Sequence, residues 1–201
     1  MKTLIFSFLS ILAFDSFSQI KLKSEAPLMD KAMLNTQGDS LSLQEIKKEN
    51  GFIVIFSCNT CPFVVGTPDF PGWERQYNEL YNSALKANIG FVLINSNEKK
   101  RTGDDSFDNM KIRADKMAYE MPYLLDENSV LANAMDAKTT PHAFFFDKNN
   151  KLIYAGSIDN IWDGNRKKDE QYLLKALQSV LNGKKIKQNY TAPKGCSIKR
   201  L

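Results

Sequence analysis

Two cysteines three residues apart, Cys58 and Cys61, are the residues whose type and spacing best suit chemistry. They follow residues 52–56, an apolar run whose β-branched and aromatic side chains predict a buried strand. Pro62 comes next and suits the first turn of a helix, so the pair lies where a strand gives way to a helix. Unpaired N–H groups and the helix dipole at such a point favour thiolate over thiol. The sequence therefore predicts a dithiol/disulfide couple.

The same pair could instead form a structural disulfide or half of a zinc site. Zinc needs about four ligands, and the chain offers one further cysteine, Cys196, and one histidine, His142. A site of three cysteines and one histidine would use every such residue, so we expect no bound metal and no cofactor. We interpret His142 as a strand residue beside the pair, with a catalytic role as the alternative.

Composition and charge favour one globular domain without a nucleic-acid partner. The chain has 201 residues, of which 43% are hydrophobic and 25% charged, typical of a single well-packed domain. The net charge of +4 is small, and many basic residues cluster near the end. No aromatic residues alternate with them as in nucleic-acid sites, so we interpret 183–201 as a solvated basic tail carrying Cys196, following a domain over 24–182.

The first residues have the pattern of a secretory signal. Lys2 precedes the apolar run 4–14, and the small residues Ser16 and Ser18 flank Phe17 just before Gln19. The run is too short to cross a bilayer, which takes about 20 apolar residues. We therefore predict a signal peptide over 1–18, an exported protein of the bacterial periplasm and no stable membrane insertion, with a tethering or buried helix as the alternative.

Export changes how the cysteines are interpreted. Outside the cytosol thiols are driven towards disulfides, and a small exported protein stabilised by disulfides carries more of them, evenly paired. This chain has three cysteines, two of them in one short motif. That favours a chemical role for the motif over a structural one.

The remaining segments predict alternating strands and helices. The expected strands are 28–34 and 40–43 as a pair around a glycine turn, 52–56, 89–95, 122–126, and a hairpin of 142–147 with 152–156. The expected helices are 43–49, one after the cysteines broken in two by Pro68, Pro71 and Gly72, one capped by Ser106 and running to 119, 128–135 and 169–181. Residues 96–106 read as an exposed loop. This order predicts an α/β fold whose mixed sheet has its first strands parallel.

Several motifs of the chain resemble those of a known fold and family. A buried strand ending in Cys58-x-x-Cys61, followed later by Thr140-Pro141 opening another strand, resembles the thioredoxin fold, in which the proline is cis and packs against the dithiol. Four segments (58–64, 94–97, 122–126 and 195–199) together resemble the redoxin group, also called alkyl hydroperoxide reductase/thiol-specific antioxidant. The closest branch is its exported peroxiredoxin-like members, and the resemblance extends from about residue 26 to the C-terminus.

The resemblance implies roles for individual residues. Cys58 would be the attacking thiolate and Cys61 would resolve the mixed disulfide. Thr140 would offer backbone hydrogen bonds to an extended substrate segment, and Pro141 would shape the groove. The tail would fold back near the pair, which makes Cys196 either a second resolving thiol or an unpaired cysteine without a role.

The chain departs from true peroxiredoxins at the active site. Their P-x-x-x-T-x-x-C pattern, counted back from Cys58, meets Gly51 and Ile55. Counted back from Cys61 it meets Val54 and Cys58. The threonine that would position a peroxide is missing, which argues against peroxidase activity.

A second departure concerns the proton acceptor. The buried acid that thioredoxins carry before the motif would fall at Phe52. No local acceptor is visible, and Asp126 and Glu74 are the candidates to replace it.

We therefore predict an exported thiol–disulfide oxidoreductase that exchanges disulfides with protein or small thiol substrates. It would need an electron donor that the sequence does not identify. The alternative is a thiol peroxidase with an antioxidant role, in which Cys58 reacts with peroxide and Cys61 or Cys196 resolves it. A third reading is a non-enzymatic module, either a scaffold or a site for zinc or Cu(I).

Overall fold

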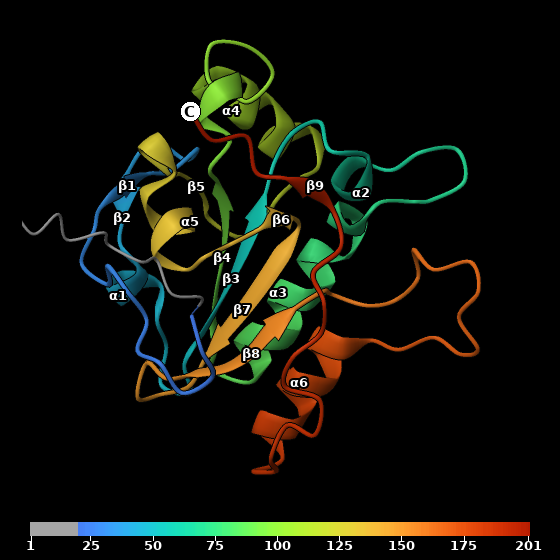
Figure 1. Ribbon diagram of the computed structural model, residues 1–201. Helices are drawn as coiled ribbons and strands as arrows, with labels where there is room; N and C mark the ends of the chain where they lie inside the picture. Colours follow the sequence, from blue (N-terminus) through green and yellow to red (C-terminus); the bar gives the residue numbers. More distant parts are fainter. Residues whose placement is uncertain (1–19) are drawn as a thin grey trace, which may run out of the picture.

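A five-stranded mixed sheet forms the centre of the computed structural model, which describes residues 20–201 (Figure 1). The predicted signal peptide lies outside the described residues. The strand order is β5–β4–β3–β7–β8. The strands are β3 (Phe52–Ser57), β4 (Gly90–Asn95), β5 (Tyr123–Leu125), β7 (His142–Phe146) and β8 (Leu152–Gly156). β3 is parallel to β4, β4 is parallel to β5, and β7 is antiparallel to both β3 and β8. The predicted α/β fold, with parallel early strands and a late hairpin, is confirmed.

Helices cover both faces of this sheet. The α-helices are α1 (Leu43–Ile46), α2 (Pro62–Val65), α3 (Tyr77–Lys86), α4 (Phe107–Lys116), α5 (Val130–Ala134) and α6 (Tyr172–Leu181). Short 3-10 segments are Trp73–Gln76, Glu98–Lys100 and Glu127–Ser129. Two small ladders complete the fold: β1 (Met33–Leu34) with β2 (Ser40–Leu41), and β6 (Thr139–Thr140) with β9 (Cys196–Ser197).

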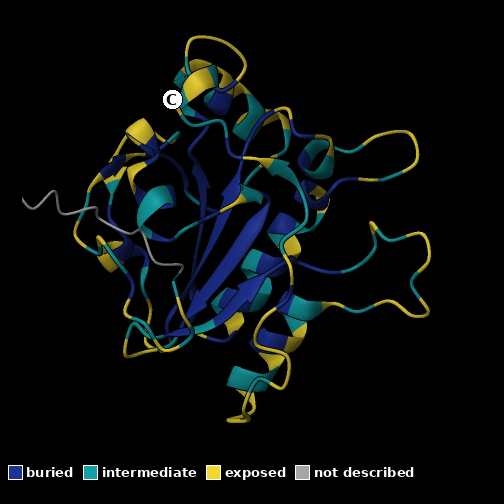
Figure 2. Cartoon of the chain, viewed as in Figure 1, coloured by how far each residue is buried: buried dark blue, intermediate teal, exposed yellow. Residues whose placement is uncertain are grey.

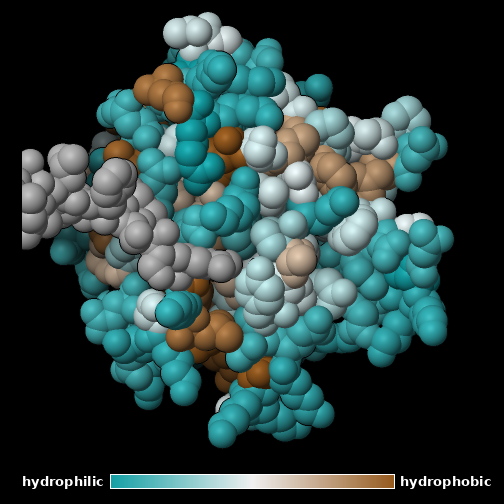
Figure 3. Space-filling model, viewed as in Figure 1, coloured by the Kyte–Doolittle hydropathy of each residue, from teal (hydrophilic) through white to brown (hydrophobic). Residues whose placement is uncertain are grey.

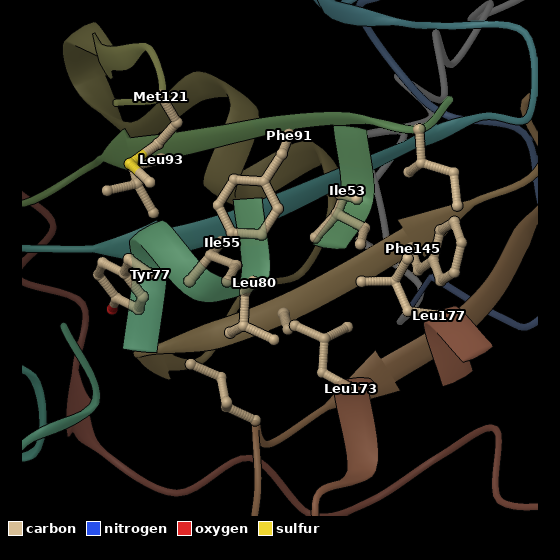
Figure 4. Packing of buried hydrophobic residues seen from close by; sticks show 14 of the residues in the cluster. Ile53, Ile55, Tyr77, Leu80, Phe91, Leu93, Met121, Phe145, Leu173 and Leu177 are labelled. Atoms are coloured by element: carbon tan, nitrogen blue, oxygen red, sulfur yellow. The ribbon is translucent and has the colours of Figure 1, made fainter. Parts of the chain in front are cut away.

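The strands are buried because each face of the sheet packs against its own helices. Every residue of β3, β4 and β7 is buried, and Figure 2 shows the sheet as the dark interior of the molecule. In β3, Ile53 and Ile55 pack on the α3 and α6 face, shown in Figure 4, while Phe52, Val54 and Phe56 pack on the α1 and α5 face. This explains why the run 52–56 shows no polar alternation.

Most predicted elements form, and several are shorter than expected. The N-terminal strand pair has two residues per strand, because Leu28 has a positive φ of 54° and the chain before β1 is irregular. The helix expected at 128–135 is α-helical only over α5, and the one expected from 169 begins at Tyr172. Ser106 caps α4 as predicted, accepting the Asn109 N–H at 3.2 Å. The helix after the cysteines is broken in two, as predicted.

The prediction of an exposed loop over 96–106 is wrong in part. Ser96, Asn97 and Asp105 are buried, and Glu98–Lys100 forms a 3-10 turn. The segment begins at the carboxyl end of β4, which lies beside the end of β3 where the cysteines follow. Polar side chains there have buried partners to bind, so they do not face solvent.

Within residues 20–201, no helix combines the length and the apolar character needed to span a bilayer.

Candidate active site

The two cysteines lie directly after the central strand. β3 ends at Ser57, and Cys58 and Cys61 are 2% and 4% exposed. Cys61 is the N-cap of α2 and Pro62 its first residue, as the sequence predicts. Because α2 has only four residues, its dipole contributes little. The environment of the sulfurs is therefore set by individual hydrogen bonds.

Thr140 contacts both sulfurs. Its hydroxyl lies 3.1 Å from Cys58 Sγ, and its carbonyl oxygen lies 3.0 Å from Cys61 Sγ, where it accepts the proton of a Cys61 thiol. The Cys61 N–H also points at Cys58 Sγ, at 3.4 Å. The Thr140–Pro141 peptide bond is cis. The structure thus brings the predicted groove residues against the predicted dithiol.

The C-terminal residues lie on the same site. β9 pairs antiparallel with β6, so that Thr140 faces Cys196 and Thr139 faces Ser197. The Cys196 N–H donates to Cys61 Sγ at 3.3 Å. The prediction that the tail folds back near the pair is confirmed, and in Figure 1 the end of the chain runs past β8 and β6 to the α2 and α4 end of the sheet.

The interpretation of the tail as solvated is wrong for its last residues. Ile198 is 5% exposed and packs with the α1 and α5 face of the core. The Lys199 N–H donates to Asn97 Oδ1 at 2.8 Å, and Arg200 Nε donates to Asn133 Oδ1 at 2.7 Å. By contrast, residues 182–185 are exposed. The basic residues near the C-terminus led to the prediction of a solvated tail, although the chain there forms a short strand packed against the site.

The thiols carry unequal pKa values because they bond to one another. The pKa of Cys61 is lowered to about 5, first by a hydrogen bond from the Cys58 thiol, with further bonds from the Cys196 thiol and N–H. The pKa of Cys58 is raised well above the ordinary value because it donates that bond, is buried and lies near the charge of Asp105. Burial and its bond to Cys61 raise the pKa of Cys196 to about 11. At neutral pH the pair therefore holds one negative charge and one proton.

Asp105 is a site residue that the sequence did not reveal. It is fully buried, and its Oδ1 accepts the N–H of Asn59, the residue after Cys58, at 2.8 Å. Asn95 and Asn97 donate to the same carboxylate at 2.8 and 2.9 Å. These bonds fix the turn that carries the cysteines. The available signal was the polar run after β4, since neighbouring parallel strands end at the same edge of the sheet.

The two carboxylates proposed as proton acceptors are used elsewhere. Glu74 pairs with Arg113 and accepts the Tyr119 hydroxyl. Asp126 accepts the hydroxyl of Ser96 at 2.7 Å and the N–H groups of Leu131 and Ala132 in the first turn of α5. Phe52, at the position of the thioredoxin acid, is a fully buried core residue.

His142 lies in β7, one residue after Pro141, as predicted. Its Nδ1 accepts the Lys138 N–H at 3.2 Å, and its ring packs on Phe144 with centroids 4.3 Å apart. Burial lowers the pKa of His142 to about 3, so the ring is neutral. Within residues 20–201, no group of three or more His, Cys, Asp or Glu residues is arranged to hold a metal ion.

A small cavity opens onto the sulfurs. Its volume is about 140 Å³, and Cys58, Cys61, Cys196, Lys100 and Lys199 contribute to its lining. In the view of Figure 3, the surface along the tail is mixed, with hydrophilic, intermediate and hydrophobic residues. Lys100 and Lys199 give the opening of this cavity a positive charge.

The Redoxin family profile matches residues 21–173. The chain belongs to the Redoxin family. None of the curated proteins matches it. Its family membership and thioredoxin-like fold give it a thioredoxin-like redox function, and confirm the resemblance found in the sequence.

Solved structures share this fold. An uncharacterised conserved protein from Geobacillus kaustophilus is 31% identical with a TM-score of 0.80, covering 91% of this chain and 94% of its own. A hypothetical protein from Sinorhizobium meliloti 1021 is 26% identical with a TM-score of 0.79, covering 92% and 97%. The thioredoxin domain of a thiol-disulfide oxidoreductase from Bacteroides vulgatus is 14% identical with a TM-score of 0.57, covering 82% and 100%, and shares the fold.

Proposed function

We propose that this protein is an exported thiol–disulfide oxidoreductase that exchanges disulfides with proteins or small thiols through Cys58 and Cys61. The observation that supports this most strongly is the arrangement of hydrogen bonds around the two sulfurs. Two donors, the Cys61 N–H and the Thr140 hydroxyl, are placed for Cys58 Sγ, whereas Cys61 Sγ faces the Thr140 carbonyl oxygen. This arrangement stabilises a thiolate on Cys58 whenever the proton that the pair shares lies on Cys61. In the resting reduced pair the proton lies on Cys58 and the charge on Cys61.

The chemistry follows from the shared proton. When the proton lies on Cys61, the Cys58 thiolate attacks one sulfur of a substrate disulfide and forms a mixed disulfide, releasing the other sulfur as a thiolate. Cys61 then loses its proton and attacks Cys58 Sγ, which closes the Cys58–Cys61 disulfide and releases the second substrate thiolate. Two electrons have passed to the substrate. A dithiol reductant must return them before the next turnover.

A thiol peroxidase is the alternative function, and one contact in the site supports it. The Thr140 hydroxyl lies 3.1 Å from Cys58 Sγ, from a different element than the peroxiredoxin pattern prescribes. At the position of that pattern's threonine stands Ile55, a fully buried residue of β3 that packs in the core. A hydroxyl on Thr140 bonded to sulfur serves disulfide exchange equally well, so we rank the peroxidase second.

Export belongs to the proposal too. It rests on the signal-like pattern of residues 1–18, and it would place the dithiol in a compartment where substrate disulfides form. Expression of the full chain in a bacterium, with mass measurement of the periplasmic product, tests it. A mature protein beginning near Gln19 supports export, and an uncleaved cytosolic product contradicts it.

The test of the activity compares two oxidised substrates under one reductant. The mature protein and its Cys58→Ser and Cys61→Ser variants are assayed with dithiothreitol as donor, against insulin disulfides and against hydrogen peroxide. Wild-type protein alkylated beforehand gives the background. We expect insulin to be reduced faster than peroxide, with the activity lost in Cys58→Ser. Fast peroxide consumption with a sulfenic acid on Cys58 would favour the peroxidase, and an inert pair would contradict both.

A further inference from the structure

We propose that Cys196 is a third redox-active thiol that takes over the disulfide from the Cys58–Cys61 pair by bonding to Cys61. This rests on the proposed function, because the pair must first become oxidised. The proposal gives the docked tail a chemical purpose: it carries the disulfide from two buried sulfurs to a more accessible one.

The register of β9 places Cys196 at the reacting sulfurs. Cys196 pairs with Thr140, the residue whose hydroxyl and carbonyl oxygen contact Cys58 and Cys61. Its N–H donates to Cys61 Sγ at 3.3 Å, and its side chain packs on the cluster formed by Cys58, Cys61 and Val64. An extended substrate would use the same backbone edge of Thr140. The tail thus lies where a substrate would bind, with its own thiol at the site.

Contacts on both sides of Cys196 hold it in this position. Before it, Gly195 adopts a φ of +159°, and a Cβ there would lie 2.3 Å from the Thr140 carbonyl oxygen, so only glycine allows this approach. After it, Ile198 is buried in the core and Lys199 bonds to Asn97. Asn97 also donates to Asp105, which binds the turn between the cysteines. The tail and the dithiol turn therefore share one buried network.

The exchange balances without any added reagent. The Cys196 thiolate attacks Cys61 Sγ in the Cys58–Cys61 disulfide, forming the Cys61–Cys196 bond and breaking the Cys58–Cys61 bond. The electron pair of the broken bond goes to Cys58, which becomes a thiolate. The proton that Cys196 loses is taken up by Cys58 or by solvent. The Thr140 hydroxyl and the Cys61 N–H are already placed to stabilise Cys58 as the leaving thiolate.

Oxidation of the pair itself prepares Cys196 to attack. In the reduced protein, Cys196 donates a hydrogen bond to Cys61, which together with burial keeps its pKa high. Once Cys61 is part of a disulfide it is no longer a charged acceptor, while Lys199 and Lys100 continue to favour a Cys196 thiolate. After the exchange, the electron donor meets Cys196, which is more exposed than Cys58 or Cys61.

Trypsin separates the two disulfides by mass. Cys58 and Cys61 fall in one tryptic peptide, 49–75, whereas Cys196 falls in another, 195–199. A Cys58–Cys61 bond leaves the peptides separate, and a Cys61–Cys196 bond links them, with Cys58 free for alkylation. Reduced mature protein is treated with limiting oxidised glutathione, quenched by acid at successive times, alkylated with N-ethylmaleimide, digested and weighed.

We expect the internal disulfide to appear first in the wild type, followed by linked peptides carrying alkylated Cys58. Cys58→Ser, and Cys58→Ala as a second choice should the serine variant misfold, should form the linked peptides directly, and Cys61→Ser should not. The double variant Cys196→Ser with Ser197→Cys is the matched control. It moves the thiol to the other face of β9 and should lose the link.

Each other outcome decides against the proposal in a distinct way. An internal disulfide in the wild type, with no linked peptides there or in either Cys58 variant, overturns the role of Cys196 and leaves the proposed function intact. Linked peptides in Cys61→Ser but not in Cys58→Ser overturn the assignment to Cys61. If the double variant Cys196→Ser with Ser197→Cys forms linked peptides as readily as the wild type, the position of the thiol at 196 has no role and the proposal fails. If no disulfide forms at all, the proposed function itself fails.

Discussion

Thr140 and Cys196 face each other across one short ladder and contact the same sulfur, yet the molecule holds them very differently. Thr140 is 1% exposed and leads directly into β7, which is paired on both sides within the central sheet. Cys196 lies in a two-residue strand and is only partly buried. One side of the site is fixed by the sheet, whereas the other is a docked end of the chain. The difference suggests that Thr140 orients the sulfurs and the tail can exchange with them or move aside.

The largest effect is expected from removing the sulfur that Thr140 orients. Cys58→Ser should lower the rate of insulin reduction by about 10³-fold or more, since a serine hydroxyl is not ionised and is a far weaker nucleophile. The measurement is turbidity with dithiothreitol as donor. Retention of more than a tenth of the wild-type rate would show that Cys58 is not the attacking group.

A smaller loss of exchange rate should follow from changing Thr140, the residue that the central sheet holds fixed. Thr140→Val removes the hydroxyl bonded to Cys58 Sγ and keeps the shape of the side chain. A hydrogen bond to a charged group contributes about 1.5–3 kcal/mol, so the exchange rate should fall by about tenfold or more. Thr140→Ser keeps the hydroxyl and is the control. Equal rates in both variants would mean that this hydroxyl does not support the thiolate.

Loosening the docked tail segment β9 should increase, and not decrease, the reactivity of the pair. Gly195→Ala forces a Cβ against the Thr140 carbonyl oxygen, which should detach β9 and expose the pair. We expect alkylation of Cys61 in the reduced protein to speed up by about tenfold, corresponding to about 1.4 kcal/mol of lost docking. Gly164→Ala, where a Cβ meets no atom within 4 Å, is the control. Unchanged alkylation in Gly195→Ala would contradict a detachable tail.

The mildest change should be a shift in titration. The pKa of Cys61 is about 5, and Cys196 contributes to lowering it, so Cys196→Ala should move the thiolate titration upward. As the pH falls through about 5 the wild type should lose its ultraviolet thiolate absorbance and its exchange activity, because the lowered pKa keeps the charge only above that value. A variant titration that coincides with the wild type would exclude coupling between the two thiols.

Much of the fold could be predicted because hydrophobic patterning is local. The run 52–56 is buried on both faces, and its uninterrupted apolar character revealed a central strand. Helix ends were less predictable. Residues 169–171 continue the apparent helical pattern, but the N-cap Gln171 has φ −88° and ψ 80°, outside the helical region, so α6 begins only at Tyr172.

The site was predictable where residue type determines the chemistry, and not where it depends on distant contacts. Cys58, Cys61, Thr140 and Pro141 could be placed together by motif. Asp105 could not, because a charged residue in a polar stretch reads as solvated until its three donors come together from other segments. The docked tail was concealed for the same reason, since its basic residues outweigh the one buried anchor, Ile198.

The central claim is that Cys58 and Cys61 form a reversible two-electron couple. A redox titration of the mature Cys196→Ser variant in glutathione buffers, in which the disulfide cannot pass on to Cys196, tests it most directly, with alkylation and mass spectrometry at each potential. We expect both cysteines to become protected together in one reversible transition, with tryptic peptide 49–75 losing two alkyl groups at once. Cysteines that stay alkylatable across the whole range, or a Cys58 that oxidises alone, would contradict the account.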